Sequence, residues 1–243
     1  MAPLLVLDSL SFGYEDRTIF DDLSFSMKAG EWVLLIGPNG CGKTTFIRLI
    51  SGFLQARTGN IYFKNKQITD FPAFSRMRLG IKYLRQTRNI FPAQTVLDNL
   101  QIALLSRRQK DFTTRLDFVL DIFPELSTDL NRYAGLLSGG LRQKLALAMV
   151  VAGEGDLWLF DEPTAGLAPN SAKEIFDRLG KIKSATTGDI APAALIVEHN
   201  YKFAKRIITR VLGMREGRIL LDEDKEPSIT LSDKPFLERL FFG

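Results

Sequence analysis

The stretch that most constrains the fold is GPNGCGKTT, residues 37–45, because it separates two apolar segments of different periodicity. The preceding run, EWVLLIG, is apolar from Trp32 to Ile36, which is typical of a strand buried on both faces. The following run, TFIRLISGFL, carries its apolar residues at helical spacing. A glycine-rich turn between a strand and a helix directs backbone N–H groups at phosphate oxygens, so we expect an α/β fold with a phosphate-binding loop.

The same loop fits the spacing G-x-x-x-x-G-K-[ST], which gives its polar side chains definite roles. Lys43 would reach the oxygens of a β- and a γ-phosphate, and the Thr44 hydroxyl would be a ligand of Mg²⁺. The residues expected to hold the phosphates are Gly37, Pro38, Asn39, Gly40, Cys41, Gly42, Lys43, Thr44 and Thr45.

Two carboxylates follow a second apolar run, LWLFDEP, residues 157–163. Asp161 ends the predicted strand, which places it at the strand tips beside the phosphate loop. We expect Asp161 to bind Mg²⁺ through water. Glu162 is the next residue and would point toward an attacking water, as its general base or orienting group.

Two further polar residues stand at predicted strand ends. Gln86 ends GIKYLRQ and could reach both Mg²⁺ and the water, although a glutamine at a strand end means little alone. His199 ends AALIVEH, and a lone histidine after an apolar strand is usually structural. Its place after the strand that follows the carboxylates makes it a candidate contact of the γ-phosphate.

A second candidate anion site lies in LLSGGLRQKLALAMVVA, residues 136–152. Ser138, Gly139 and Gly140 open a predicted helix, so free N–H groups and the positive end of the helix dipole face outward there. A chain that already has a phosphate-binding loop has no evident use for a second anion site.

The remaining elements follow from apolar spacing. Residues 4–36 are predicted to form strands, with apolar and polar residues alternating in LLVLDSLSFGY and LSFSMKAG. GNIYFKNKQI predicts a hairpin around Asn65 and Lys66, and residues 91–152 have helical spacing with Thr95 as first cap. Helices are predicted at 170–184 and 200–209, a strand at 193–199, and a strand pair at 210–221 around Glu216 and Gly217.

Composition limits the classes of protein. Apolar residues make up 45% and charged residues 25%, as in soluble globular proteins, and the net charge of +4 is a mild basic bias. No run of 18 apolar residues occurs, so a membrane role would need another chain to span the bilayer. The single cysteine, Cys41, excludes an internal disulfide. Its place among loop N–H groups and beside Lys43 predicts a lowered thiol pKa, and thus inactivation by N-ethylmaleimide with protection by MgATP.

Taken in order, Tyr14, GPNGCGKTT, Gln86, LSGGLRQ, LWLFDEP, AGLAP and VEHN resemble the nucleotide-binding subunit of an ATP-binding cassette (ABC) transporter over nearly the whole chain. The resemblance implies hydrolysis of ATP with Mg²⁺ and a P-loop NTPase core of RecA-like fold. It implies that Tyr14, otherwise an ordinary surface aromatic, stacks on adenine. The implied division is a core with an antiparallel β subdomain at 1–90 and 153–225, an inserted helical subdomain at 91–152, and a short helical tail at 226–243.

The resemblance also accounts for the second anion site. In this family two ATPase copies dock head to tail, and Ser138–Gly140 of one copy would close over the γ-phosphate held by the other. Residues 165–169 would lie at the same interface. Leu141 stands where the family commonly has Gln or Glu. The dimer is therefore expected to be either a homodimer or a heterodimer with a sister ATPase.

Within the family, GLAP, VEHN and IFPAQTVLDNL resemble the ATPases of importers of branched-chain amino acids, with urea and amide importers close by. This branch implies transmembrane permease subunits, an extracytoplasmic solute-binding protein, and a peripheral position on the cytoplasmic face of the cell membrane. A groove between Gln86 and the helical segment, with Phe91 and Pro92, is the candidate dock for a permease helix; ordinary core packing of Phe91 is the alternative.

Two other functions remain open at this point: a lipopolysaccharide-export ATPase, and a soluble ABC ATPase of the iron–sulfur cluster assembly type. We expect no nucleic-acid partner, because the DNA-maintenance members carry long coiled coils and no heptad array occurs here.

Overall fold

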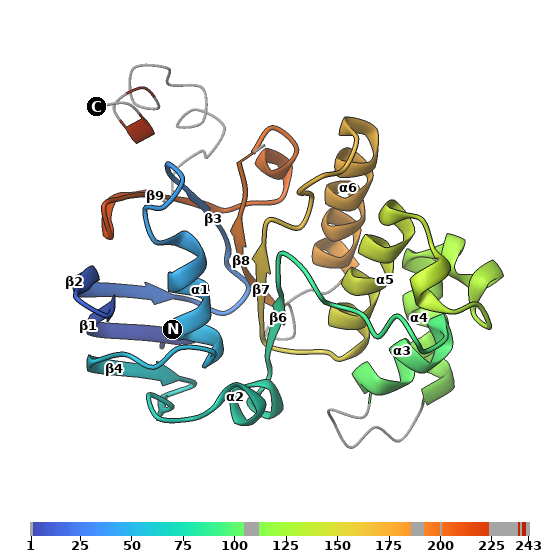
Figure 1. Cartoon of the computed structure of the whole chain (residues 1–243), viewed down its shortest axis with the longest axis horizontal. Helices are drawn as coiled ribbons and strands as arrows, with labels where there is room; N and C mark the ends of the chain where they lie inside the picture. Colours follow the sequence, from blue (N-terminus) through green and yellow to red (C-terminus); the bar gives the residue numbers. More distant parts are fainter. Residues whose placement is uncertain are drawn as a thin grey trace.

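The computed structural model describes residues 2–104, 112–185, 192–199, 201–223, 238 and 240–241. They form two sheets flanked by helices: a six-stranded sheet in the order β10-β9-β3-β8-β7-β6 and a four-stranded sheet in the order β2-β1-β4-β5. Figure 1 shows the four-stranded sheet at one end, the six-stranded sheet in the middle and the helices α3 to α6 at the other end. Within these residues, no helix is long and apolar enough to cross a membrane.

The central sheet is mostly parallel. Strands β3 (Trp32–Ile36), β6 (Ile81–Leu84), β7 (Leu157–Asp161), β8 (Ala193–Val197) and β9 (Arg210–Arg215) run parallel, and β10 (Arg218–Glu223) pairs antiparallel with β9 at one edge. Every residue of β3, β7 and β8 is buried, which confirms the strands predicted from continuous apolar runs.

Alternate residues of β3 belong to different cores. Trp32, Leu34 and Ile36 pack with α5 (Gly139–Ala152) and α6 (Pro169–Ala185) on one face of the sheet. Val33 and Leu35 pack with α1 (Lys43–Ser51) and the antiparallel sheet on the other. Because successive side chains of a strand point to opposite faces, one strand supports both layers.

The antiparallel sheet consists of β1 (Leu5–Tyr14), β2 (Arg17–Met27), β4 (Thr58–Phe63) and β5 (Lys66–Gln67). The turn between β4 and β5 holds Lys64 and Asn65, both with positive φ, so the predicted hairpin is confirmed with its turn one residue earlier. Buried side chains of this sheet pack against α1, and this contact fixes the end of the sheet that carries Tyr14 beside the phosphate loop.

The region between β6 and β7 is helical, as predicted. It contains α3 (Val96–Leu104), α4 (Phe112–Ile122), the short 3₁₀ helices η1 (Pro124–Asp129) and η2 (Ala134–Leu136), and α5. Thr95 caps α3: its hydroxyl accepts from the Asp98 N–H at 3.1 Å, while the Asp98 carboxylate accepts from the Thr95 N–H at 3.0 Å. The predicted first cap is therefore confirmed.

Two elements differ from expectation. The predicted helix at 200–209 is only a 3₁₀ turn, η4 (Ala204–Arg206), because Thr209 already joins the central sheet through its N–H to the Trp32 carbonyl at 2.7 Å. Helix α2 (Ala73–Leu79) was not foreseen, since seven residues are too few to show a period. The predicted tail at 226–243 lies outside the described residues, apart from 238, 240 and 241.

Candidate nucleotide site

The loop at 37–45 turns from β3 directly into α1, as its glycines predict. Gly42 precedes the helix with φ 112°, and a Cβ there would lie 2.8 Å from the Phe20 ring, so glycine is required on both counts. Lys43 as a whole is 5% exposed, and its ammonium donates to the carbonyls of Gly37 at 2.7 Å and Pro38 at 2.8 Å. The lysine thus lies in the middle of the loop, where it can exchange these carbonyls for phosphate oxygens.

The turn between β9 and β10 supports the loop from behind. The Gly217 N–H donates to the Cys41 carbonyl at 3.0 Å, and a Cβ on Gly217 would lie 1.7 Å from the Ile19 carbonyl oxygen. Both Glu216 and Gly217 have positive φ, which confirms the strand pair predicted around them.

Asp161, the last residue of β7, is 1% exposed. One of its oxygens accepts from the Thr44 hydroxyl at 3.1 Å and the other from the Tyr83 hydroxyl at 3.1 Å. Burial raises the pKa of Asp161 despite these bonds, and burial together with the Asp161 charge raises the pKa of Tyr83. The Thr44 and Asp161 oxygens lie together beside the loop, a donor set that suits Mg²⁺ sharing its remaining positions with phosphate and water.

Glu162 lies at the centre of the polar residues predicted from strand ends. Its φ of 52° turns the chain sharply after β7, and its carboxylate accepts from the Gln86 amide at 2.9 Å and pairs with His199 Nε2 at 3.1 Å. Gln86, Glu162 and His199 follow β6, β7 and β8, three neighbouring strands whose carboxyl ends share one edge. The structure therefore brings these three together, as strand order predicts.

Tyr14 ends β1 at the rim of the same cleft, with 43% of its surface exposed. Its hydroxyl lies 3.4 Å from the Thr45 hydroxyl, and its ring meets Phe12 edge-on. The cleft has a volume of about 400 Å³ and is lined by Tyr14, Arg17, Ile19, Asn39, Gly40, Gly42, Lys43, Thr44, Thr45, Glu162 and His199. One open cleft thus joins Tyr14, six residues of the loop, Glu162 and His199, whereas Gln86 lines a different groove.

The expectation for Cys41 is wrong in direction. The thiol is 4% exposed, and burial raises its pKa by more than the Lys43 charge, 3.9 Å from the sulfur, lowers it. The sequence shows that Cys41 lies close to the Lys43 cation, but it does not show that the Cys41 side chain is buried. The thiol is therefore not an activated nucleophile.

Ser138 is the N-cap of α5, and its hydroxyl accepts from the Leu141 N–H at 3.3 Å. A Cβ on Gly139 or Gly140 would meet no atom within 4 Å, so this helix start is open on its outer side. None of Ser138, Gly139 and Gly140 lines the cleft of Tyr14 and Lys43. Leu141 is partly buried against the larger apolar core of its own chain.

Three residues beside the site were given no role in the site from the sequence, although Glu198 stands in the VEHN motif. Tyr83 bonds Asp161, Glu198 bonds Thr164 two residues after Glu162, and the Gln143 amide of α5 donates to the Pro163 carbonyl at 2.6 Å. Glu198 left a signal as the acidic residue of VEHN, where it was used only to indicate the branch of the family. The other two depend on contacts between segments far apart in the chain.

A strand, a glycine-rich loop and a helix, with a carboxylate at the end of β7, one strand beyond the neighbour of β3, define a nucleotide hydrolase of the P-loop class. Comparison with known proteins narrows the class. A family model described as ABC transporter matches residues 20–165, and the chain belongs to this family of ATPases.

Two curated relatives and one solved structure illustrate the similarity. A probable branched-chain amino acid transport ATP-binding protein, LivF, of Archaeoglobus fulgidus is 37% identical over 86% of this chain and 87% of its own. The high-affinity branched-chain amino acid transport ATP-binding protein BraG of Pseudomonas aeruginosa is 30% identical over 90% and 92%. The ADP conformation of an ATP-binding cassette of an ABC transporter superimposes with a TM-score of 0.81 at 28% identity, covering 98% of both chains.

Proposed function

We propose that this ATPase hydrolyses MgATP in the cleft between Tyr14 and His199 and thereby powers import of a branched-chain amino acid or a related small solute. The catalytic part rests on the contact of Glu162 with both Gln86 and His199 beside the phosphate loop. The cargo is inferred from the two relatives, whose names refer to branched-chain amino acid transport. Urea or an amide would suit the same branch of the family.

The triphosphate would lie across the start of α1. Backbone N–H groups of residues 37–45 and the helix dipole attract the phosphates, and Lys43 would leave the Gly37 and Pro38 carbonyls for the β- and γ-phosphate oxygens. Tyr14 would stack on the adenine ring, since its exposed ring stands at the rim of the cleft.

Thr44 and Asp161 would hold Mg²⁺, with Gln86 as a further oxygen ligand. Mg²⁺ bound there would draw charge from the β- and γ-phosphates. In the structure the Thr44 hydroxyl donates to Asp161, so this hydroxyl would turn its oxygen toward the metal while Tyr83 continues to hold the carboxylate.

Glu162 would accept the proton of the water that attacks the γ-phosphorus, with ADP as the leaving group. Gln86 would orient that water, and His199 would donate to the γ-phosphate. The side chains of Glu162 and His199 are 18% and 43% exposed, so both can be reached from the cleft. Their mutual contact keeps them next to each other.

The helix start at Ser138–Gly140 would serve the cleft of a second ATPase in a head-to-tail dimer. The support is its place outside its own cleft and its open outer side. In this assignment residues 91–152 form the helical unit that carries the start of α5, and residues 1–90 and 153–225 form the core with the loop. The partner would be a second copy or a sister ATPase.

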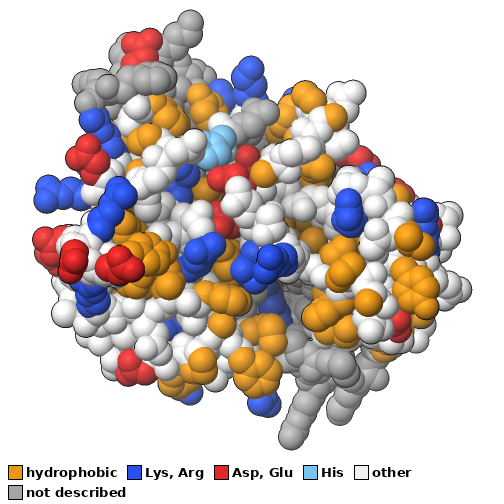
Figure 2. Space-filling view, viewed as in Figure 1, with side chains coloured by type: hydrophobic (Ala, Val, Ile, Leu, Met, Phe, Trp, Pro, Cys, Tyr) orange, Lys and Arg blue, Asp and Glu red, His pale blue; other side chains and the backbone are white. Residues whose placement is uncertain are grey.

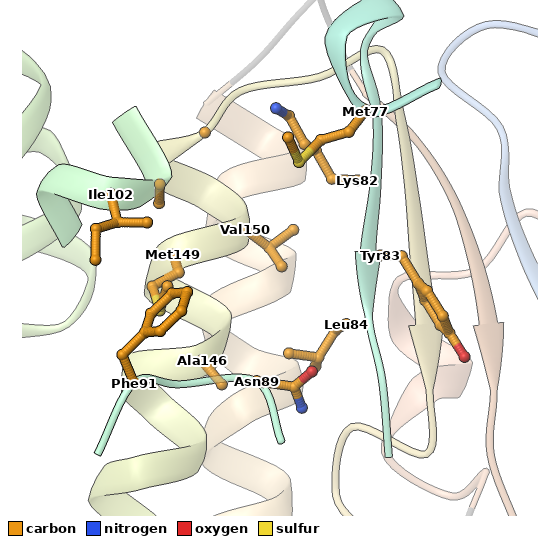
Figure 3. A pocket seen from close by; sticks show the side chains of 12 residues that line it. Met77, Lys82, Tyr83, Leu84, Asn89, Phe91, Ile102, Ala146, Met149 and Val150 are labelled. Atoms are coloured by element: carbon orange, nitrogen blue, oxygen red, sulfur yellow. The ribbon is translucent and has the colours of Figure 1, made fainter. Parts of the chain in front are cut away.

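A permease helix would dock in the apolar groove between β6 and α5. The groove has a volume of about 320 Å³, and Figure 3 shows Phe91, Ile102, Met149 and Val150 among the side chains around it. Figure 2 shows this face of the molecule hollowed between the sheet and the helices, with hydrophobic side chains on both sides. Phe91 is 48% exposed, which supports docking over core packing. Pro92 lines an adjoining groove with Gln86 and Gly139.

These contacts would place the protein on the cytoplasmic face of the membrane, peripheral to its permease subunits. A solute-binding protein outside the cell would supply the cargo. The ATPase would not touch the solute, so the cargo is tested in the complete transporter.

The catalytic proposal is tested with Glu162→Gln. We expect turnover of MgATP to fall at least about 100-fold, because general-base catalysis contributes about 10²–10⁴. Light scattering after size exclusion should show that Glu162→Gln is a dimer only with MgATP. Glu154→Gln is the control variant and should behave as wild type. Unchanged turnover would overturn the assignment of Glu162, and a persistent monomer with ATP bound would favour a sister ATPase. Uptake of labelled leucine, with urea for comparison, tests the cargo.

A further inference from the structure

Glu198 is a buried carboxylate between the two loops that carry Glu162 and His199. It follows β8 directly and is 4% exposed. One oxygen accepts from both the N–H and the hydroxyl of Thr164, at 2.9 and 2.5 Å. The other accepts from the His199 N–H at 3.2 Å. A single side chain therefore bonds the loop after β7 and the loop after β8.

The loop after β7 is a tight turn that starts at Glu162. The Ala165 N–H donates to the Glu162 carbonyl at 3.1 Å, and the Leu167 N–H donates to the Thr164 carbonyl at 3.1 Å. The Glu162 N–H donates to the Val197 carbonyl at 2.9 Å, one residue before Glu198. Residues 162 and 164 are thus bonded to residues 197 and 198, and the turn is continuous with the end of β8.

A carboxylate is an expensive group to bury, and it is retained only where donors surround it. An apolar residue at position 198 would leave the buried Thr164 hydroxyl and two N–H groups without this acceptor. The same bonds fix two backbones whose side chains, Glu162 and His199, meet at 3.1 Å on the cleft side. In enzymes that hold reacting groups in a fixed geometry, a misplacement of about 1 Å can lower the rate about 100-fold.

We propose that Glu198 is a positioning residue for ATP hydrolysis: through Thr164 and the His199 backbone it sets the distance between Glu162 and His199. The inference rests on the proposed roles of Glu162 and His199. It does not involve the phosphate loop, so ATP binding and hydrolysis should respond differently to its loss.

The experiment compares Glu198→Gln, Thr164→Val and Thr164→Ser in the full chain. The amide of Glu198→Gln can still accept from Thr164 but turns an N–H₂ group toward the His199 N–H. Thr164→Val removes the hydroxyl and keeps the shape, and Thr164→Ser keeps the hydroxyl. Asp177→Asn, on the exposed side of α6, is the matched acid-to-amide control. The measurements are single-turnover hydrolysis with protein in excess over labelled ATP, the ATP concentration for half-maximal rate, and thermal unfolding.

We expect Glu198→Gln to lower the single-turnover rate about 10- to 100-fold while the half-saturating ATP concentration stays within about twofold. Thr164→Val should lower the rate less, and Thr164→Ser should restore it. A purely structural role would instead lower the unfolding temperature and the fraction of ATP-binding protein with an unchanged rate per bound ATP. That result, or a rate within about twofold of wild type, would overturn the inference if Glu162→Gln abolishes turnover. Full turnover in Glu162→Gln would instead refute the proposed role of Glu162, on which this inference rests.

Discussion

Arg76 provides a sharp test of how the phosphate-loop helix is held. The guanidinium of this α2 residue is fully buried and donates to four carbonyls: Phe71 at 2.8 Å, Leu49 at 2.6 Å, Ile50 at 3.0 Å and Thr69 at 2.7 Å. Leu49 and Ile50 belong to the last turn of α1, where carbonyls lack i+4 partners; the Leu49 carbonyl also accepts from the Gly52 N–H at 3.3 Å, so Arg76 is its second donor. Burial lowers the pKa of Arg76 to about 10, so the group is still charged at neutral pH.

Arg76→Met should destabilise the protein by about 4 kcal/mol. Each carbonyl left without a donor costs about 1–3 kcal/mol, and water entering the site would recover part of the sum. For a chain of this length a loss of 1 kcal/mol lowers Tm by about 2–4 °C, so we expect a fall of about 8–16 °C. Arg76→Lys should lie between, because one ammonium cannot span the four carbonyls.

The assay is urea and thermal unfolding followed by circular dichroism. Arg78→Met is the control: Arg78 lies on the same helix but is exposed, with its guanidinium over the Phe74 ring. We expect it to change stability by less than about 0.5 kcal/mol. If Arg76→Met costs less than about 1 kcal/mol, or no more than Arg78→Met, the buried guanidinium does not hold the end of α1.

Three further predictions concern the site. Asp161→Asn should abolish MgATP hydrolysis but stabilise the protein by about 0.5–2 kcal/mol, seen as a higher urea midpoint. The reason is that burial raises the pKa of Asp161, so the free energy of unfolding falls as the pH rises from the ordinary pKa through the raised one. The cost of the ionised carboxylate therefore persists at neutral pH and is absent in the amide. Cys41 should react with N-ethylmaleimide about tenfold more slowly at pH 7 than in the urea-unfolded chain, since burial raises its pKa; equal rates would contradict the burial argument. Phe91→Asp should prevent co-purification with the permease subunits while ATP affinity stays unchanged, and an intact complex would exclude the groove as the dock.

Much of the central sheet and the cluster of Gln86, Glu162 and His199 could be predicted from the sequence. Long apolar runs mark β3, β7 and β8, and polar residues directly after parallel strands must meet at one edge. That rule alone places Gln86 and His199 beside Glu162, where the structure has them.

Other contacts could not be predicted, because they depend on distances through space. Tyr83 reaches Asp161 from 78 positions earlier in the chain, and Arg76 reaches Leu49 across 27. The direction in which the Cys41 pKa is shifted depends on two opposed effects, the Lys43 charge and burial, and the sequence shows only the charge. The helical pattern at 200–209 was overridden by the pairing of Thr209 with β3.

Because the side chains of β3 alternate between two cores, insertions and deletions within this strand have a predictable effect. Losing or gaining one residue between Trp32 and Ile36 would invert which side chains face each layer, setting the Trp32 indole against the antiparallel sheet. It would also rotate Gly37, where an added Cβ would lie only 2.0 Å from the Met214 carbonyl oxygen. Insertion or deletion of one residue in β3 should therefore prevent folding, whereas the same change in the exposed turn at Lys64 and Asn65 should be tolerated.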